Sequence, residues 1–324
     1  MFVGIREIKK AKGRFGLIVG TVALITLLVV VLTGLTSGLG KQNTSALEAL
    51  APESVVFENN EDPSFTTSRV TARDGLVPLG TGQTLMQVED GGEESVAVLS
   101  LPEGTQLPGG QVLGAGAVAS SSLGLTEGDR VQLGGTATTI DELTDDLQFS
   151  HTPVVWVPTE IWQGAFHTDA DGTVLLSGNK NDGVSLKDSF KGLAAYSSER
   201  GSLLMIQGFL YAIAALVIIA FLTVWTMQRT RDLAILKAIG ASNTYLLKDA
   251  LGQSAILLLI GTLIGGLAAL AVGIGMAGVA PFTLSANVIA LPPVLVWVLG
   301  MIGALLATRS IVKVNPQSAL GGVA

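Results

Sequence analysis

Long uncharged apolar stretches alternate with charged segments along this chain of 324 residues. No Asp, Glu, Lys or Arg occurs in residues 15–40, 201–228 or 250–308. An apolar run of about 18 residues or more can cross the hydrocarbon core of a bilayer, so each stretch is a candidate membrane span. The third stretch is long enough for two spans, and Gly278 and Pro281 mark a turn between them. The pattern therefore predicts four membrane-spanning helices.

The first apolar stretch could also be read as a cleaved signal peptide, because Arg14 and other basic residues precede it. Thirteen Leu, Ile and Val residues lie between Leu17 and Leu35, and they favour insertion by roughly 5 kcal/mol. This apolar core is longer than the usual 7 to 15 residues of a signal peptide, and no clear small-residue cleavage site follows. We therefore expect an uncleaved helix.

Residues 41–200 have a different pattern, in which short apolar segments are separated by turn dipeptides such as Asp74-Gly75 and Asp171-Gly172. We expect helices near 117–123 and 188–200 and a mixed α and β domain. The fold class is thus a polytopic α-helical membrane protein with four transmembrane helices and a mixed α+β extracellular domain between helices 1 and 2. The expected strands cover residues 54–58, 70–72, 95–100, 130–133 and 154–157.

Composition supports a membrane protein and excludes several soluble classes. Charged residues make up 14% of the chain, well below the roughly 25% of globular proteins, and the mean hydropathy is +0.56. Disorder, a disulfide-stabilised secreted scaffold and a cytosolic enzyme are all disfavoured. The chain has no cysteine, which removes thiolate and disulfide sites.

The distribution of charge predicts the orientation in the cell membrane. Residues 41–200 carry 8 basic and 23 acidic groups, a net charge of −15, whereas the rest of the chain carries +8. Because Lys and Arg are enriched on the cytoplasmic side, both termini are expected inside and the acidic domain outside. The partners expected are membrane lipids and no nucleic acid. The expected segments are a cytoplasmic elbow helix (1–14), span one (15–40), the extracellular domain (41–200), span two (201–228), a cytoplasmic amphipathic helix (229–246), span three (247–278), an extracellular turn (279–288), span four (289–308) and a cytoplasmic tail (309–324).

Few residues suggest chemistry. The acidic run 141–146 lacks the spacing of a calcium loop, so a solvated surface is favoured. His151 is better explained as an exposed or hydrogen-bonded side chain than as a haem ligand, and Met86 as core filling. Catalytic residues, resident metal sites and an intrinsic cofactor are not expected, because no paired carboxylates or nucleophile and base occur in a recognisable motif.

Several segments, in this order, resemble the MacB/FtsX-type permeases of ATP-binding cassette (ABC) transporters. The amphipathic helix alone would be equally consistent with a loop anchored to lipid. Together with the four-span topology, the order of the motifs is specific. The segments are the basic elbow before span one, Gly114 to Gly134 in the extracellular domain, Arg229 to Ser242 after span two, and Thr308 to Leu320 at the end.

The resemblance implies a bacterial homodimer carried on two ATPase subunits, which bind the ATP. In the family, the helix after span two couples the permease to the ATPases, and spans one and two pack at the dimer seam, where we expect Gly34 and Gly38. This chain has Asp232 where many relatives have Glu, and it lacks a complete phosphate-binding loop of its own. The residues to which coupling is assigned are Arg229, Arg231, Asp232, Leu233, Leu236, Lys237 and Gly240.

Within the family, residues 6–15 and the compact outer domain are most similar to permease subunits of haem exporters from Gram-positive bacteria. This similarity implies that ATP-driven motion of spans one and two, termed mechanotransmission, extracts haem from the membrane and expels it outward. Two alternatives stay open. One is export of a lipid, peptide or antimicrobial compound, and the other is a signalling permease that controls an extracellular cell-wall enzyme.

A helical projection around Glu199 suggests where haem would bind. A carboxylate or phenolate oxygen can ligate ferric haem, and a two-fold axis would present each such group twice. The other interpretation is that Glu199 and Arg200 mark the membrane interface and the tyrosines form an aromatic belt. Helical periodicity of 100° per residue places five residues on one face with Glu199, namely Tyr196, Leu203, Gln207, Leu210 and Tyr211, and the residues predicted to bind haem are Glu199, Tyr196, Leu203, Gln207 and Tyr211.

Overall fold

The computed structural model describes residues 12–89, 91–228, 230–276 and 278–312. It divides into two compact units. The helical unit comprises Met1–Gly38 and Leu203–Ala324, and the sheet unit comprises Leu39–Ser202. The elbow helix expected at residues 1–14 and the tail expected at 309–324 lie largely outside the described residues.

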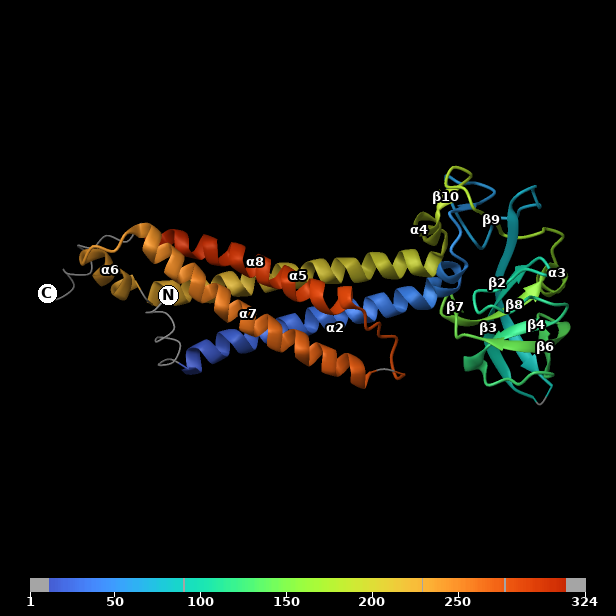
Figure 1. Ribbon diagram of the computed structural model, residues 1–324, viewed down its shortest axis with the longest axis horizontal. Coiled ribbons are helices and arrows are strands. Elements are labelled where there is room, and N and C mark those ends of the chain that lie inside the picture. Colours follow the sequence, from blue (N-terminus) through green and yellow to red (C-terminus); the bar gives the residue numbers. More distant parts are fainter. Residues whose placement is uncertain (1–11, 90, 229, 277, 313–324) are drawn as a thin grey trace. The chain divides into compact units, whose positions relative to one another are not determined.

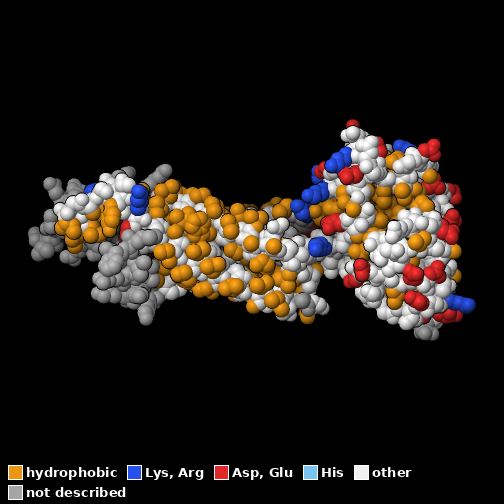
Figure 2. Space-filling model, in the orientation of Figure 1, with side chains coloured by type: hydrophobic (Ala, Val, Ile, Leu, Met, Phe, Trp, Pro, Cys, Tyr) orange, Lys and Arg blue, Asp and Glu red, His pale blue; other side chains and the backbone are white. Residues whose placement is uncertain are grey.

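Four helices of the described chain are long and apolar enough to cross a membrane, which confirms the four-span prediction (Figure 1). The helix containing span one has 39 residues, roughly 58 Å at 1.5 Å per residue, more than the hydrocarbon core requires. Figure 2 shows hydrophobic side chains covering the visible face of these helices. The four long helices are α2 (Lys12–Leu50), α5 (Ala194–Gln228), α7 (Asn243–Gly275) and α8 (Ala286–Val312), and the short helix α6 (Thr230–Ala238) lies between α5 and α7 in the sequence.

Glycine permits close packing of α7 against α2 in the helical unit. A Cβ atom on Gly265 would overlap the carbonyl oxygen of Ala23, and one on Gly261 would lie 2.7 Å from a methyl carbon of Val22. Small residues at a four-residue spacing are a common means of bringing membrane helices together. Phe15 on α2 also packs edge-to-face on Trp225 of α5, with ring centroids 6.0 Å apart.

The sheet unit is built on ten strands, six of which close into a ring. Around the ring the strands follow the order β2-β3-β8-β4-β6-β5. The ring closes where β5 pairs with the C-terminal end of β2. The other end of β2 continues the sheet through β9, β1 and β10, while β7 pairs with β8 (Figure 1). The strands are β1 (Ser54–Val56), β2 (Val77–Val88), β3 (Glu93–Leu101), β4 (Ala117–Ser120), β5 (Arg130–Leu133), β6 (Thr136–Thr144), β7 (Gln148–Phe149), β8 (Thr152–Pro158), β9 (Val174–Ser177) and β10 (Val184–Ser185).

Alternate residues of the central strands enter two separate cores. On β8, Val155 and Val157 pack in a core inside the ring, with Met86 also fully buried there, as core filling predicted. Val154 and Trp156 face a second core. Successive strand residues point to opposite faces, and both faces are covered here, which explains why these strands read as continuous apolar runs.

The end of α2 and the segment that precedes α5 contribute to the second core. The C-terminal turns of α2 contribute Ala46 and Leu47, and the segment before α5 contributes Phe190 and Leu193. Outside that core, α3 (Thr159–Phe166) follows β8, and α4 (Leu186–Ser189) precedes α5. The sheet unit therefore holds the end of the first long helix and the start of the second in one packed body.

The prediction of a helix near residues 117–123 is wrong, because residues 117–120 form β4 and residues 121–123 form a single 3₁₀ turn. All four residues of β4 are buried, since the strand lies between β6 and β8 in the ring. The expected strand at 70–72 is reduced to one bridge, between Val70 and Gly172. By contrast, the strand expected at 130–133 has those bounds in the structure.

Candidate functional site

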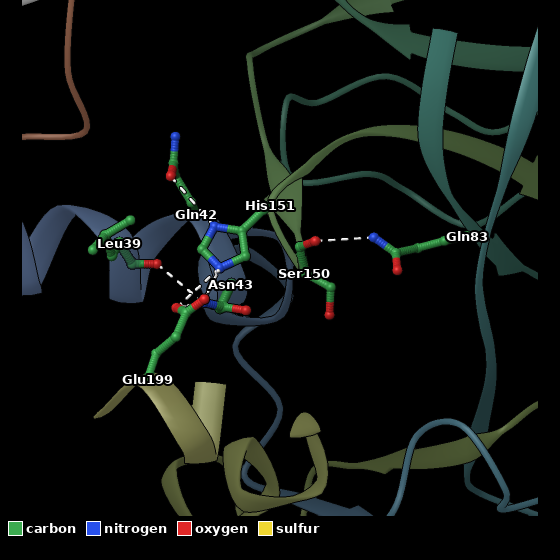
Figure 3. A network of polar contacts seen from close by, with 7 residues as sticks. All are labelled: Leu39, Gln42, Asn43, Gln83, Ser150, His151 and Glu199. Atoms are coloured by element: carbon green, nitrogen blue, oxygen red, sulfur yellow. Dashed lines mark hydrogen bonds and ion pairs between the residues drawn. The ribbon is translucent and has the colours of Figure 1, made fainter. Parts of the chain in front are cut away.

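A polar network within the sheet unit joins three segments that are distant in the sequence (Figure 3). Glu199 lies in the first turns of α5, Asn43 lies near the end of α2, and His151 lies in the tight turn between β7 and β8. The His151 Nε2 atom is 2.9 Å from Oε1 and 3.0 Å from Oε2 of Glu199. Asn43 Nδ2 lies 3.2 Å from Oε2 of the same carboxylate. Two donors thus converge on one carboxylate.

The hydrogen-bonding capacity of these groups assigns their roles. Asn43 Nδ2 lies 3.2 Å from both the Leu39 carbonyl oxygen and Glu199 Oε2, and 2.9 Å from His151 Nε2. A flipped amide would place its oxygen against these two acceptors, so the orientation with Nδ2 facing them is favoured. In the tautomer that carries hydrogen on Nε2, His151 donates to Glu199, and Nδ1 lies 3.4 Å from Oε1 of Gln42.

The turn that carries His151 has an uncommon backbone. Phe149 pairs with Thr152, so Ser150 and His151 form a two-residue hairpin loop, and both have positive φ, 49° and 67°. Positive φ at both central positions is the hallmark of the type I′ turn, for which Asn-Gly is preferred. A left-handed conformation costs an ordinary residue about 1–2 kcal/mol. Strained residues of this kind concentrate at functional sites.

Hydrogen bonds from two directions fix this hairpin loop. The backbone N–H groups of Ser150 and His151 donate to the carbonyl oxygens of Asn43 and Gln42, at 3.2 and 2.9 Å. On the other side, Gln83 Nε2 on β2 donates to the Ser150 carbonyl oxygen at 2.9 Å (Figure 3). The imidazole is therefore presented by a loop held between α2 and the sheet.

The Glu199 carboxylate keeps access to solvent or a ligand. Its side chain is 38% exposed, and that of His151 is 29% exposed. An ionised carboxylate has about four lone-pair positions, so two donated hydrogen bonds leave acceptor capacity for a metal centre. Among the described residues, no three His, Asp or Glu side chains gather as a metal site would require.

Tyr196 lies one turn before Glu199 and points elsewhere. Its ring packs edge-to-face on Phe190 at 5.6 Å. Its hydroxyl accepts a hydrogen bond from Arg200 Nη1 at 2.9 Å, and the guanidinium lies 5.5 Å from the ring centroid. Tyr196 therefore shares the helix start with Glu199 but is engaged with its own neighbours.

The remaining haem-site predictions fall in the helical unit. Leu203, Gln207 and Tyr211 are each partly buried within that unit, and Gln207 Nε2 donates to the Thr33 hydroxyl on α2 at 2.8 Å. Large apolar side chains on the rest of this helix, such as Phe209 and Leu216, are more than 60% exposed. A role of these three residues toward haem stays a prediction.

The helix assigned to ATPase coupling is present as α6, and Gly240 ends it with φ of 103°. Leu236 packs inward on Leu246 and Ala250. Ile235 and Ile239 are exposed instead, at 49% and 77%. Lys237 is partly buried; Arg229 lies outside the described residues, as do the side chains of Arg231, Asp232 and Leu233.

The glycines assigned to the dimer seam contact their own chain. A Cβ on Gly34 would overlap the ring of Phe282, and one on Gly38 would overlap the carbonyl oxygen of Pro281. Pro281 and Phe282 lie in the connection between α7 and α8. The seam itself involves a second chain and stays a prediction.

Helical periodicity in the sequence grouped Glu199 with neighbours on its own helix, but it did not indicate the residues that contact Glu199 in the structure. His151 was interpreted as exposed or hydrogen-bonded, without a named partner, and Asn43 and Gln42 gave no signal. His151 lies 48 residues before Glu199, and Asn43 and Gln42 lie more than 150 residues before it. Helical periodicity around Glu199 could therefore not reveal them.

Comparison with known proteins bears on what such a site serves. Residues 204–316 match the model of the FtsX-like permease C-terminal domain. The chain is 25% identical to a putative hemin transport system permease protein HrtB of Staphylococcus haemolyticus and 26% identical to one of Staphylococcus epidermidis, in each case over 98% of both chains. It is 23% identical to an uncharacterized ABC transporter permease of Mycobacterium bovis, over 99% of both chains.

Proposed function

We propose that the chain is a multi-pass permease of an FtsX-like ABC transporter that exports haem, because residues 204–316 match the FtsX-like permease C-terminal model and four helices are long and apolar enough to cross a membrane. In this proposal it is the membrane subunit of an efflux pump that takes haem from the membrane and expels it outward. Two copies assemble with two ATPase subunits, which bind and hydrolyse ATP. The chain itself is not the enzyme.

Similarity to two HrtB proteins over nearly the full length supports haem as the cargo. The observation that carries the proposal is the Glu199 carboxylate, which is held by two donors and remains 38% exposed. Haem supplies its own iron, and ferric iron accepts oxygen ligands such as the tyrosinate of catalase. We assign Glu199 as the residue that ligates the iron, twice in the dimer because of its two-fold axis.

The orientation proposed follows from charge. The residues outside 41–200 carry a net +8 and residues 41–200 a net −15. With basic loops on the cytoplasmic side, both termini and α6 are inside, and the sheet unit is outside. On the visible face of the sheet unit, Asp and Glu side chains are prominent (Figure 2). Haem carries negatively charged propionate groups. The acidic surface of the sheet unit would therefore repel haem once it is released, which favours its movement away from the cell.

The mechanical part of the proposal assigns a lever to α2 and α5. Each is a continuous helix of 35 residues or more, and each contributes residues to both units. Closure of the two ATPases would push on α6, and the long helices would transmit this movement to the sheet unit. Haem held at Glu199 would then be displaced outward without crossing a complete pore.

A titration of the purified full-length permease with hemin tests the function. We expect wild type to shift the hemin absorbance band, Glu199→Ala to abolish the shift, and Glu160→Ala, an exposed carboxylate on α3, to behave as wild type. Binding by Glu199→Ala as tight as by wild type would reject the assigned ligand.

The cargo is tested separately with the assembled transporter. Export of haem predicts that hemin stimulates the ATPase activity. Stimulation by peptides or lipids but not by hemin would indicate the alternative cargoes. ATPase activity that responds to no cargo, together with loss of cell-wall hydrolysis in a deletion strain, would indicate a signalling permease.

A further inference from the structure

We propose that His151 is a positioning residue for the Glu199 carboxylate, an inference that rests on the proposed function. The imidazole does not bind the iron in this proposal. It holds the carboxylate in the orientation in which one oxygen can reach a metal centre.

The first argument is the geometry of the donors. His151 Nε2 lies 2.9 and 3.0 Å from the two carboxylate oxygens, and Asn43 Nδ2 adds a third contact from α2 at 3.2 Å. Glu has three rotatable side-chain torsions, so an exposed Glu at a helix surface has no fixed carboxylate position. Donors from two other elements remove that freedom before any ligand arrives.

The second argument is the rigidity of the loop that presents His151. The loop is hydrogen-bonded to α2 through two backbone N–H groups and to β2 through Gln83. Thr152 Oγ1 also donates to the Phe149 carbonyl oxygen at 3.0 Å, which closes the turn from inside. A donor is useful for positioning only when its own place is fixed, and this loop supplies that condition.

The third argument is the residue chosen for the turn. Position 151 has a φ of 67°, a conformation that Asn and Gly adopt more easily in a two-residue loop. Hairpin formation alone would therefore be served better by Asn. The presence of His at this position is explained by what its Nε2 atom reaches, namely the carboxylate on α5.

Hydrogen-bonding partners that orient metal-ligating side chains typically affect affinity by 10–100-fold when they are removed. We therefore expect loss of the His151 donor to weaken hemin binding at least tenfold. The ligand atom on the iron would be unchanged, so the spectrum of the saturated complex would stay the same.

Two conservative variants separate positioning from a merely structural role. In His151→Asn the backbone is well suited to the turn, but the amide nitrogen is one bond closer to the backbone than Nε2 and falls short of Glu199. In His151→Gln the amide nitrogen is the same number of bonds from Cβ as Nε2, but the side chain is less suited to positive φ.

The experiment is a hemin titration and a thermal unfolding measurement on full-length permease in lipid nanodiscs, with Glu199→Ala in parallel. We expect His151→Asn to unfold at or above the wild-type temperature and to bind hemin at least tenfold more weakly. His151→Gln should unfold at a lower temperature and retain affinity within about threefold of wild type.

Three outcomes overturn the inference. Wild-type hemin affinity in His151→Asn would show that the donor is dispensable. A changed electron paramagnetic resonance spectrum in the saturated His151→Asn complex would show that His151 itself ligates the iron. Wild-type affinity in Glu199→Ala would reject the assigned ligand of the proposed function, whereas loss of binding in Glu199→Ala with normal binding in His151→Asn would reject only the positioning role.

Discussion

The helical unit and the sheet unit satisfy their polar side chains in different ways. In the helical unit, Thr26, Thr33 and Thr308 each donate to the carbonyl oxygen four residues earlier on their own helix. In the sheet unit, polar contacts connect segments far apart in the sequence, as in Asn43 with Glu199 and Ser45 with Gln148. Hydrogen bonds between helices also occur in the helical unit, as in Gln207 with Thr33 and Trp297 with Ala255, but contacts within one helix are common there.

The two units also differ in what surrounds them. Side chains such as Leu216 and Leu267 of the helical unit are more than 60% exposed, as suits a surface in contact with lipid. The sheet unit buries Leu99, Trp156 and Trp162 completely. Transfer from water to the protein interior stabilises the sheet unit, while lipid already solvates the outer helix surfaces.

The largest effect should come from truncating a buried leucine of the sheet unit, with an exposed leucine of the helical unit as the matched control. Leu99→Ala removes a fully buried side chain from the sheet unit and should lower the free energy of unfolding by about 2–5 kcal/mol. Leu267→Ala removes a side chain that is 66% exposed in the helical unit and should change it by less than about 0.5 kcal/mol. Thermal unfolding of both full-length variants measures the contrast, and equal losses would contradict it.

The next effect concerns the close approach of α7 and α2. In Gly265→Ala the new methyl group meets the backbone at Ala23, which cannot rotate away, so we expect a loss of about 1–3 kcal/mol. Gly20→Ala is the control, because a Cβ at Gly20 has open space around it. That control should be neutral or slightly stabilising, since Ala is the better helix former. Unfolding temperatures that fall equally would disprove the packing argument.

A smaller effect is expected from the exposed apolar side chains of α6. If this helix docks on an ATPase subunit, Ile239→Asp should lower ATPase activity of the assembled transporter about tenfold, equivalent to about 1.4 kcal/mol of contact, without changing permease stability. Leu236→Asp should lower the stability of the permease itself, because Leu236 packs on Leu246. Normal hemin-stimulated activity in Ile239→Asp would reject the docking surface.

The smallest effect is a pH dependence confined to the sheet unit. Hydrogen bonds from Lys191 and Ser185 lower the pKa of Asp188 in the folded state. A lowered folded pKa stabilises the protein above the unfolded pKa, and this contribution is lost as the pH falls through the folded value. Asp188→Asn should therefore unfold at a slightly lower temperature than wild type at pH 7 and at the same temperature in acid.

The double variant Asp188→Asn with Lys191→Gln is the control for this pair. Because the two side chains form one contact, at 2.7 Å, the losses of the single variants should not add. Full additivity at pH 7, or an equal difference at every pH, would show that the pair does not stabilise the sheet unit.

The local sequence pattern was sufficient to predict the elements whose surroundings are uniform along their length. The four long helices follow from uncharged stretches because a bilayer demands about 20 apolar residues in succession, and β5 follows from four alternating residues between turns. Pattern failed at residues 117–123, where the short apolar segment 117–119 suits a helix or a buried strand equally well. Only pairing with β6 and β8 decided in favour of a strand.

The candidate site likewise combines one residue that the sequence indicates with others that only the tertiary structure brings close to it. Glu199 could be singled out because a carboxylate beside an apolar span is costly to place and therefore conspicuous. The sequence by itself thus determined the spans and the charge asymmetry, since each is a property of contiguous residues, whereas the role of Glu199 stays a prediction. The tertiary structure decided that His151 and Asn43 hold Glu199, because the contacts depend on how a hairpin and two helices meet across more than 100 residues of chain.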